Sequence, residues 1–149
     1  LDQVKLALPQ APEVHIDIDA MHRAHAHMRS QQPLKLQTGA THAAAWSDLD
    51  GHIVQLREDV GRHNALDKLI GACVRAHLPL ASGFLAITSR ASYEMVQKTT
   101  AAGVGTLVAV SGVTSLAVDV AEHTGLTLLG FARGTDLTVY THPARLQWT

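Results

Sequence analysis

The sequence predicts a three-layer α/β/α domain around a mixed β-sheet. Three runs in its second half, 84–88, 106–110 and 126–131, are largely apolar and alternate with helical stretches. Apolar strands separated by helices are typical of a sheet that is covered on both faces and has parallel neighbours. Asp50-Gly51, between two short strand-like stretches, indicates an antiparallel hairpin, which makes the sheet mixed.

The first part of the chain predicts an entry segment and one helix. Residues 1–14 contain two prolines and little periodicity, which is typical of a linker. A helix is expected over 17–30, with Ile18, Met21 and either His25 or Met28 facing inward, and Pro33 marks its end. A turn is expected at 37–41, and strands at 42–46 and 52–56. We therefore separate an N-terminal linker and helix, 1–36, from an α/β/α domain, 37–149.

The remaining elements alternate regularly. A helix over 61–77 carries Leu66, Leu69, Ile70 and Cys73 at the spacing of one buried face. Helices over 93–102 and 116–124 follow the first two apolar strands, and Gly125 is the expected C-terminal cap of the second. A last strand is expected over 137–140.

The composition is that of one globular domain. The chain has 149 residues, 46% hydrophobic and 17% charged, with a net charge of −1. Near-neutral charge argues against binding a nucleic-acid polymer, and no apolar run is long enough to span a membrane. The single cysteine excludes an internal disulfide and fits a reducing compartment. Because the first residue is Leu, we expect a piece of a longer protein.

The histidines leave two alternatives open. Ten are present, and His22, His25 and His27 lie together in the first predicted helix. A metal site would need a third converging ligand, since His27 points away from the other two. An exposed polar helix face is the preferred interpretation.

A highly charged stretch, Arg57 to Lys68, carries the main functional signal. Six of its twelve residues carry formal charge, and it runs into the buried face of the helix over 61–77. A helix start offers unpaired N–H groups, and Arg62 and His63 add donors there, so the stretch favours an anion such as phosphate. The alternative is a solvated helix start with local pairs, Arg62 with Asp59 and Asn64 with Lys68.

Three turns are expected to meet at one edge of the sheet. They are 58–64, 89–92 and 111–115, and each follows a strand and precedes a helix. Arg62, Arg90, five hydroxyls and Gly112 together suit phosphates and a sugar. No Walker A or G-x-G-x-x-G pattern is present. Taken singly, each of these hydroxyls is better explained as an N-cap or a turn residue, but their recurrence at successive strand ends favours a site. Glu94 with Lys98 is most simply a surface pair.

Common hydrolytic sites are absent from the sequence. Cys73 lies on the apolar stripe of its helix and is expected to be inert. There is no G-x-S-x-G elbow. A zinc deaminase would need H-x-E and a C-x-x-C pair, neither of which is present.

Four stretches resemble the FdhD family, the formate dehydrogenase accessory sulfurtransferases. They are Thr38-Gly-Ala-Thr-His-Ala-Ala-Ala-Trp46, Glu58-Asp-Val-Gly-Arg-His-Asn-Ala-Leu-Asp-Lys68, Ser89-Arg-Ala-Ser-Tyr-Glu-Met-Val-Gln-Lys98 and Thr138-Val-Tyr-Thr-His-Pro143. The resemblance implies a cytidine-deaminase-like α/β/α fold. It also implies a sulfur carrier that passes sulfur from a cysteine desulfurase to the molybdenum bis(molybdopterin guanine dinucleotide) cofactor of formate dehydrogenase.

The resemblance further implies a cytoplasmic homodimer that binds GDP as a surrogate for the cofactor. A cofactor-binding segment of the family falls here on Phe131, Ala132, Arg133, Gly134, Thr135 and Asp136, where Asp136 makes the segment less basic than in some relatives. Combined with the three turns, the predicted cofactor-binding residues also include Thr38, Gly39, His42, Asp59, Arg62, His63, Asn64, Ser89, Arg90, Ser111, Gly112 and Thr114.

The chain departs from the family in one respect. The family carries sulfur on a C-x-x-C loop upstream of the matching region, and no such loop is present here. No catalytic residue is therefore expected in this chain, since a thiolate is needed to accept sulfur. Two functions stay open: the cofactor-binding part of a sulfurtransferase, and a nucleotide-binding chaperone module without transfer chemistry.

Overall fold

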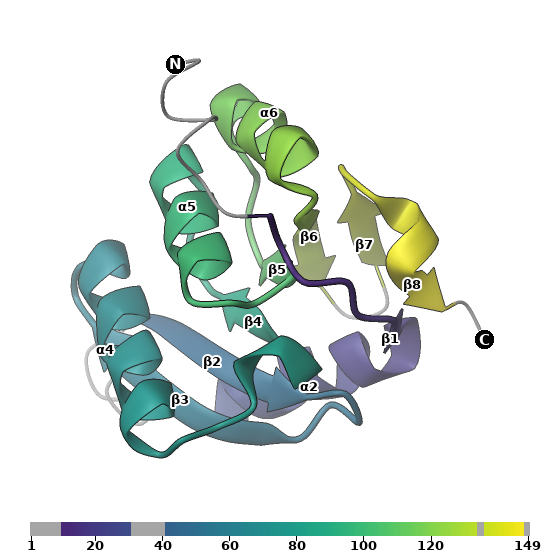
Figure 1. Cartoon of the computed structure of the whole chain (residues 1–149). Helices are drawn as coiled ribbons and strands as arrows, with labels where there is room; N and C mark the ends of the chain where they lie inside the picture. Colours follow the sequence, from purple (N-terminus) through teal and green to yellow (C-terminus); the bar gives the residue numbers. More distant parts are fainter. Residues whose placement is uncertain (1–9, 31–40, 134–135, 148–149) are drawn as a thin grey trace.

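A six-stranded sheet with the order β3-β2-β4-β5-β6-β7 forms the centre of the computed structural model (Figure 1). The structure describes residues 10–30, 41–133 and 136–147. The strands are β2 His42–Asp48, β3 Ile53–Asp59, β4 Gly83–Ile87, β5 Thr106–Ala109, β6 Thr127–Arg133 and β7 Asp136–Val139. The expected turn at 37–41 and Pro33 fall largely outside the described residues.

The sheet is mixed, as the sequence predicts. β4, β5 and β6 pair in parallel, whereas β2 is antiparallel to both of its neighbours, β3 and β4. Two reversals restore the original direction, so β3 runs the same way as β4, β5 and β6. The edge strand of this sheet, β7, returns antiparallel to β6.

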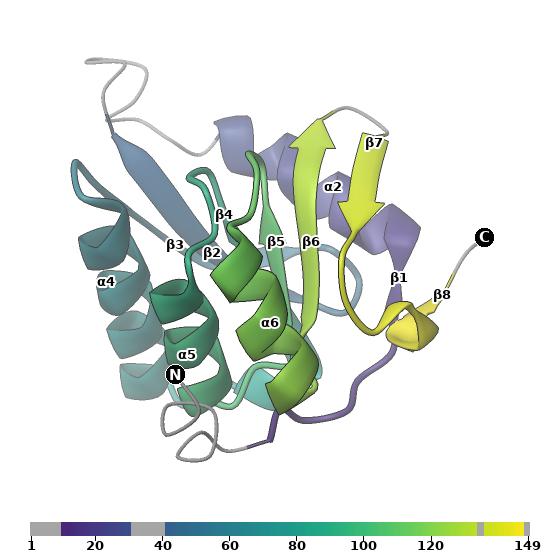
Figure 2. The same cartoon turned by 90° about the horizontal axis from the view of Figure 1, so that it is seen from above.

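Helices cover both faces of this sheet (Figure 2). The helices α4 Arg62–Arg75, α5 Tyr93–Ala101 and α6 Ser115–Thr124 lie on one face, and α2 Ile18–Ser30 lies on the other. Short 3-10 turns, η1 Leu80–Ser82 and η2 Pro143–Arg145, complete the connections. The pair β1 Ile16–Asp17 and β8 Leu146–Gln147 forms a separate two-stranded parallel sheet. The predicted three-layer α/β/α fold is confirmed.

The core explains why the central strands are apolar throughout. Along β4, Leu85 and Ile87 join the cluster under α4, α5 and α6, while Phe84 packs with Ile18 and Met21 on the α2 side. Side chains alternate between the two faces of a strand, so a strand that is covered on both faces favours apolar residues at successive positions.

The Asp50-Gly51 hairpin is confirmed and is fixed against α2. Gly51 adopts φ 86°, and its N–H donates to the Asp48 carbonyl oxygen at 3.2 Å. A Cβ on Gly51 would lie 2.4 Å from the carbonyl oxygen of Ala20. Only glycine fits this turn, both for its conformation and for its contact with the helix.

One strand boundary is wrong, because Arg57, Glu58 and Asp59 belong to β3, which extends to Asp59 and not only to residue 56. The inward face predicted for α2 is confirmed: Ile18 and Met21 are buried, and so are both alternatives for its last position, His25 at 8% and Met28 at 1% exposure. His27 is exposed, as expected for the polar face.

Among the residues that the structure describes, no helix is both long and apolar enough to cross a bilayer.

Candidate anion-binding edge of the sheet

The three predicted turns lie at one edge of the sheet. β3, β4 and β5 run in the same direction, so the segments after them, which lead into α4, α5 and α6, all leave from the same side (Figure 2). The start of β2 and the end of β6 reach this side too. We call it the anion edge, defined by residues 59–64, 89–92, 111–114 and 131–133.

The turn from β3 into α4 is held by Asp59. Its Oδ1 accepts the Gly61 N–H at 2.9 Å, and its Oδ2 lies 2.6 Å from the Lys68 Nζ. The Lys68 ammonium also donates to the Glu58 carbonyl oxygen at 3.4 Å. The hydrogen bond from Lys68, followed by that from Gly61, holds the pKa of the Asp59 carboxyl below its ordinary value. Lys68 thus fixes the start of α4, and the alternative pair between Arg62 and Asp59 is wrong.

The start of α4 offers unused donors. Gly61 is its N-cap and supplies no side-chain cap. The Arg62 side chain is exposed and has no hydrogen bond or ion pair to another described residue. The His63 Nδ1 is buried and likewise lacks a partner within the described part of the chain. A buried polar atom without a partner costs free energy, which a bound ligand can recover.

The starts of α5 and α6 differ in their caps. Thr114 Oγ1 accepts the Ala117 N–H at 3.1 Å, so the predicted N-cap is confirmed there. Ser92 makes no side-chain cap bond, and its buried Oγ has no partner among the described residues, so the predicted Ser92 cap is wrong. Arg90, beside it, is exposed and has no side-chain partner in the described part of the chain. Each helix start without a side-chain cap, α4 and α5, therefore has a neighbouring arginine that is not bonded to another described residue.

Backbone hydrogen bonds join the second and third turns. The Ala91 N–H donates to the Gly112 carbonyl oxygen, and the Thr114 N–H donates to the Ala91 carbonyl oxygen, both at 3.1 Å. The Ser111 carbonyl oxygen accepts the Phe131 N–H at 2.9 Å, which brings the end of β6 into the same edge. The two loops and the β6 end thus form one connected surface.

Phe131 is the most unusual residue of this surface. It adopts φ 53°, a conformation that bulky residues rarely take, and the residue is 47% exposed. A Cβ on Gly112 would lie 3.1 Å from the Phe131 Cζ, so the glycine leaves room for the ring. Residues held in sparsely populated backbone conformations cluster at ligand sites, which makes Phe131 a candidate contact residue of this edge.

Not every predicted site residue contributes a free group. Ser89 is buried, and its hydroxyl donates to the Arg90 carbonyl oxygen at 3.1 Å, so the turn interpretation holds for it. Ala132 is buried in the cluster under α2. His42 and Asp59 are paired residues of β2 and β3 at the same edge. Thr38, Gly39, Gly134 and Thr135 lie outside the described residues.

Sequence reasoning missed several residues that shape the edge. Thr88 Oγ1 accepts the Ala43 N–H at 2.9 Å, and the Thr41 hydroxyl donates to Glu58 Oε1 at 3.2 Å. No short motif marks them, because each depends on the pairing of distant strands. The predicted pair of Glu94 with Lys98 is replaced by an ion pair between Lys98 and Asp67 on α4, at 2.9 Å.

The histidines of α2 do not gather around a metal. In the described ranges, one group of three has ligand atoms within 4.8 Å of one another: Asp48, Asp50 and His52 of the hairpin. It lies at the β2–β3 turn, whereas the anion edge includes the opposite end of both strands. Cys73 is fully buried, and burial raises the pKa of its thiol. The prediction that Cys73 is core is confirmed.

Fold and site together define an α/β/α domain whose sheet edge carries two helix starts without a side-chain cap, each beside an exposed arginine that has no side-chain partner among the described residues. A model of the FdhD/NarQ family matches residues 1–147. The chain therefore belongs to the FdhD/NarQ family.

Two curated relatives are named sulfur carrier protein FdhD. The protein from Variovorax paradoxus (strain S110) is 55% identical over 147 residues, 98% of this chain and 53% of the relative. The protein from Xanthomonas euvesicatoria pv. vesicatoria (strain 85-10) is 50% identical over 149 residues, 97% of this chain and 53% of the relative. The chain thus spans about half the length of these relatives.

A crystal structure of a proposed formate dehydrogenase accessory protein from Desulfotalea psychrophila has the same fold. It superposes with a TM-score of 0.87 at 24% sequence identity, covering 99% of this chain and 63% of that chain.

Proposed function

We propose that this chain is the cofactor-binding part of a sulfur carrier that serves formate dehydrogenase. The names of the curated relatives support the carrier role. The observation that carries the binding role is the position of Arg62 and Arg90, which have no side-chain partner among the described residues, beside the uncapped starts of α4 and α5.

The cargo would be the guanine dinucleotide end of the molybdenum cofactor. Phosphates suit the α4 and α5 starts, where guanidinium groups and free N–H groups converge. The buried His63 Nδ1 and Ser92 Oγ lie beside these starts and would gain partners from the ligand. On the β6 side the exposed Phe131 ring offers a flat surface for the base, and the Asp136 carboxylate would accept guanine N–H donors while repelling phosphate.

Sulfur itself would travel on another group. The only cysteine, Cys73, is buried with a raised pKa, whereas sulfur transfer requires an accessible thiolate. We propose that the sulfur comes from a cysteine desulfurase through cysteines that do not belong to this stretch. The homodimer and the cytoplasmic location implied by the family resemblance are parts of the same proposal. The second candidate is a chaperone module without transfer chemistry. It is supported by the same buried thiol, because a chain without an accessible thiolate cannot accept sulfur itself.

Calorimetric titration of the 149-residue chain with GDP tests the binding role. Arg62→Ala and Arg90→Ala should each weaken binding by about 1–3 kcal/mol, the usual contribution of a charge-assisted hydrogen bond. Arg75→Ala is the matched control, because Arg75 is an exposed arginine in the last turn of the same helix. Absence of GDP binding, or equal affinity in all three variants, would remove the anion edge as the site.

A comparison of nucleotide affinities tests whether the site recognises the guanine base. If Phe131 and Asp136 recognise guanine, GDP should bind more tightly than ADP, and Asp136→Asn should reduce this preference.

Mass spectrometry after incubation with a cysteine desulfurase and cysteine separates the two candidate functions. Transfer of sulfur to a longer relative, with none to this chain, supports the sulfurtransferase, whereas transfer to neither protein supports the chaperone.

A further inference from the structure

The parts of the anion edge lie in a fixed order along the sheet (Figure 2). The start of α4 follows β3, the start of α5 follows β4 and Gly112 follows β5, while Phe131 lies in β6. In the strand order β3-β2-β4-β5-β6, the start of α5 is two strands from the start of α4 and two strands from Phe131. With strands about 4.8 Å apart, each interval is roughly 10 Å. A ligand that spans the edge therefore meets these groups one after another.

The starts of α4 and α5 lie side by side at one level. The Lys98 Nζ of α5 lies 2.9 Å from Asp67 Oδ1 of α4, and each is the sixth residue of its helix. Both helices run away from the anion edge, so equal lengths along the two helices lead back to neighbouring starts. His63 precedes Asp67 by one turn, which places it on the flank of α4 that faces α5. The N–H groups of both starts and the His63 ring therefore border the same region.

Polar atoms without a partner among the described residues occur at both of these starts. They are the buried His63 Nδ1 at α4 and the buried Ser92 Oγ at α5. At the third start, that of α6, Thr114 Oγ1 already accepts the Ala117 N–H at 3.1 Å. Buried polar groups are normally hydrogen-bonded, so unpartnered ones at a site indicate a position for a ligand or a water molecule. This difference favours the starts of α4 and α5 over that of α6 as the position of the anion.

The charges around the two starts differ. Near α4 the carboxylates of Asp59 and Asp67 are both ion-paired, so the charge of Arg62 is left uncompensated. Near α5 the charge of Arg90 is accompanied by Glu94, an exposed carboxylate in the first turn. The outer phosphate of a nucleoside diphosphate is a terminal phosphate, which carries about −1.5 to −2 charges, more than the inner phosphate. The outer phosphate therefore suits the start of α4, and the inner one suits the start of α5.

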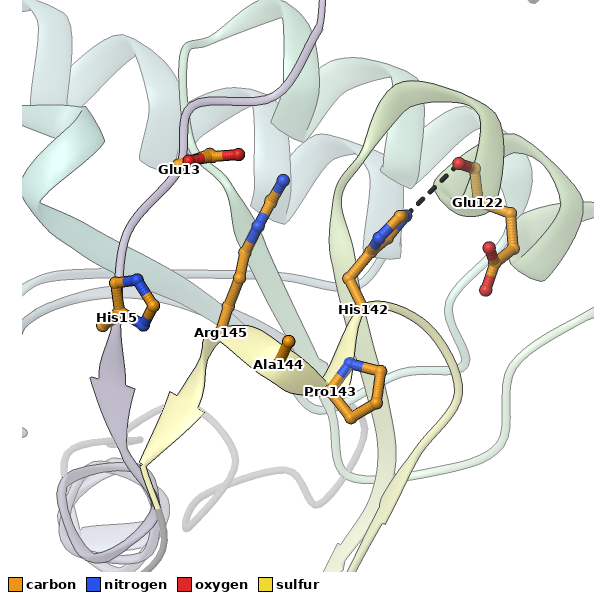
Figure 3. Close-up of a pocket in the computed structure, with 7 residues that line it drawn as sticks. All are labelled: Glu13, His15, Glu122, His142, Pro143, Ala144 and Arg145. Carbon is orange, nitrogen blue, oxygen red and sulfur yellow. Dashed lines mark hydrogen bonds between the residues drawn. The ribbon is translucent and has the colours of Figure 1, made fainter.

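The loop between the base position and the start of α5 is held in place because α6 is anchored at its far end (Figure 3). The His142 Nε2 donates to the Glu122 carbonyl oxygen at 3.2 Å, and the Arg145 guanidinium donates to the Gly125 carbonyl oxygen. These contacts form one wall of a polar groove beside His142. Since α6 begins three residues after Gly112, the anchored helix also fixes the loop that a ligand has to cross. A preformed loop favours binding across the edge.

We propose that the nucleotide lies along the edge in one direction, with its inner phosphate at Arg90 and its outer phosphate at Arg62 and His63. The inference rests on the function proposed above, which places the base on Phe131. From there the ribose crosses Gly112, and the diphosphate bridges the starts of α5 and α4. Two linked phosphates suit two starts roughly 10 Å apart better than one phosphate does, because charge-assisted hydrogen bonds are only about 2.7–2.9 Å long. A group esterified to the outer phosphate then leaves the edge on the β3 side.

Displacement of a fluorescent GDP derivative, which gives the affinities of GMP and GDP for each variant, tests the direction. Arg90→Ala should weaken GMP and GDP alike, by about tenfold or more, because both nucleotides carry the phosphate next to the ribose. Arg62→Ala should weaken GDP to the same extent and leave GMP within about twofold of its original affinity. Arg75→Ala, at the other end of α4, is the control and should change neither affinity.

Inorganic pyrophosphate tests the bridge without the base. It should displace the fluorescent derivative at least about tenfold more tightly than inorganic phosphate does. Arg62→Ala and Arg90→Ala should each remove most of this preference, because each removes one end of the bridge. His63→Ala should repeat the pattern of Arg62→Ala, with weaker binding of GDP and pyrophosphate and unchanged binding of GMP.

Failure of this inference differs from failure of the proposed function. No binding of GDP by the unaltered chain would overturn both. Binding of GDP together with equal losses of GMP affinity in Arg62→Ala and Arg90→Ala, or with the reverse pattern, would keep the anion edge as the site and overturn the direction. Equal affinities for phosphate and pyrophosphate would overturn the bridge. Both arginines are exposed and have no side-chain partner among the described residues, so the two variants should unfold at the wild-type temperature, which shows that they are folded.

Discussion

Lys68 Nζ lies 2.6 Å from Asp59 Oδ2, and this contact ties the second turn of α4 back to the end of β3. The other carboxylate oxygen of Asp59 accepts the Gly61 N–H at 2.9 Å. One side chain therefore fixes both the turn and the helix that follows it. The position of Arg62 and His63 at the anion edge depends on this pair.

Loss of the Lys68 charge should loosen the anion edge. Lys68→Met keeps the aliphatic stem and removes the contact with Asp59, so the start of α4 becomes less ordered. GDP affinity measured by calorimetry should fall about threefold to tenfold, as expected for lost preorganisation. Lys98→Met is the control, because it breaks the neighbouring Asp67 pair and leaves the turn intact. Equal losses in both variants would contradict the role of Lys68.

The same pair should shape the acid stability of the protein. Lys68, with Gly61, holds the pKa of Asp59 below its ordinary value of 3.8. This contribution to stability is therefore fully present above that ordinary value and is lost as the pH falls through the lowered pKa. In Lys68→Met the Asp59 pKa should move upward, and the loss should begin at a higher pH. An NMR titration of the Asp59 carboxyl carbon measures both values, and unchanged titration would contradict the prediction.

Two helix starts with similar hydroxyl residues should respond oppositely to alanine. Thr114→Ala removes a cap bond and should lower the free energy of unfolding by about 1 kcal/mol. Ser92→Ala removes a buried hydroxyl that has no partner among the described residues, so stability should be unchanged or higher. Urea denaturation of the two variants measures the difference. A comparable loss in Ser92→Ala would show that its hydroxyl is bonded.

Gly112 should matter for the ligand and little for the fold. A Cβ at this position would lie 3.1 Å from the Phe131 Cζ, and the half-exposed ring can move away. Gly112→Ala should therefore fold normally and bind GDP more weakly. Gly83→Ala is the contrasting variant, since its Cβ would lie 2.2 Å from the Ser47 carbonyl oxygen and 2.4 Å from the Trp46 ring. Soluble expression should be lost only for Gly83→Ala.

The thiol of Cys73 should be unreactive in the native protein. It is fully buried and its pKa is raised by burial, so little thiolate is available. A colorimetric thiol reagent should react slowly in buffer and rapidly in urea. Fast reaction under native conditions would show that the Cys73 thiol is accessible and able to accept sulfur.

Much of the fold could be predicted because apolar side chains dominate it. Strands such as β4 are buried on both faces, so their sequence alone indicates a central position. The anion edge followed from the same pattern, since loops after strands of one direction meet on one side. Helix periodicity placed Leu66, Leu69 and Cys73 in the core, as observed.

The partners of polar residues could not be predicted in the same way. Lys98 has Glu94 at the favoured helical spacing, yet it pairs with Asp67 across two helices. Ser92 stands where a cap is expected and does not make one. The groove beside His142 brings together residues from both ends of the chain. Local spacing carries no information on these distant contacts.

The short parallel pair β1 and β8 joins a segment near the start of the chain to one near its end. Ile16 is paired with Leu146, and Asp17 with Gln147, directly before α2 begins. Fraying from the C-terminal side therefore removes the support of α2 as well, although the two are far apart in sequence. Amide protection in α2, β1 and β8 should rise and fall as one cooperative unit, separate from the strands that hold the anion edge.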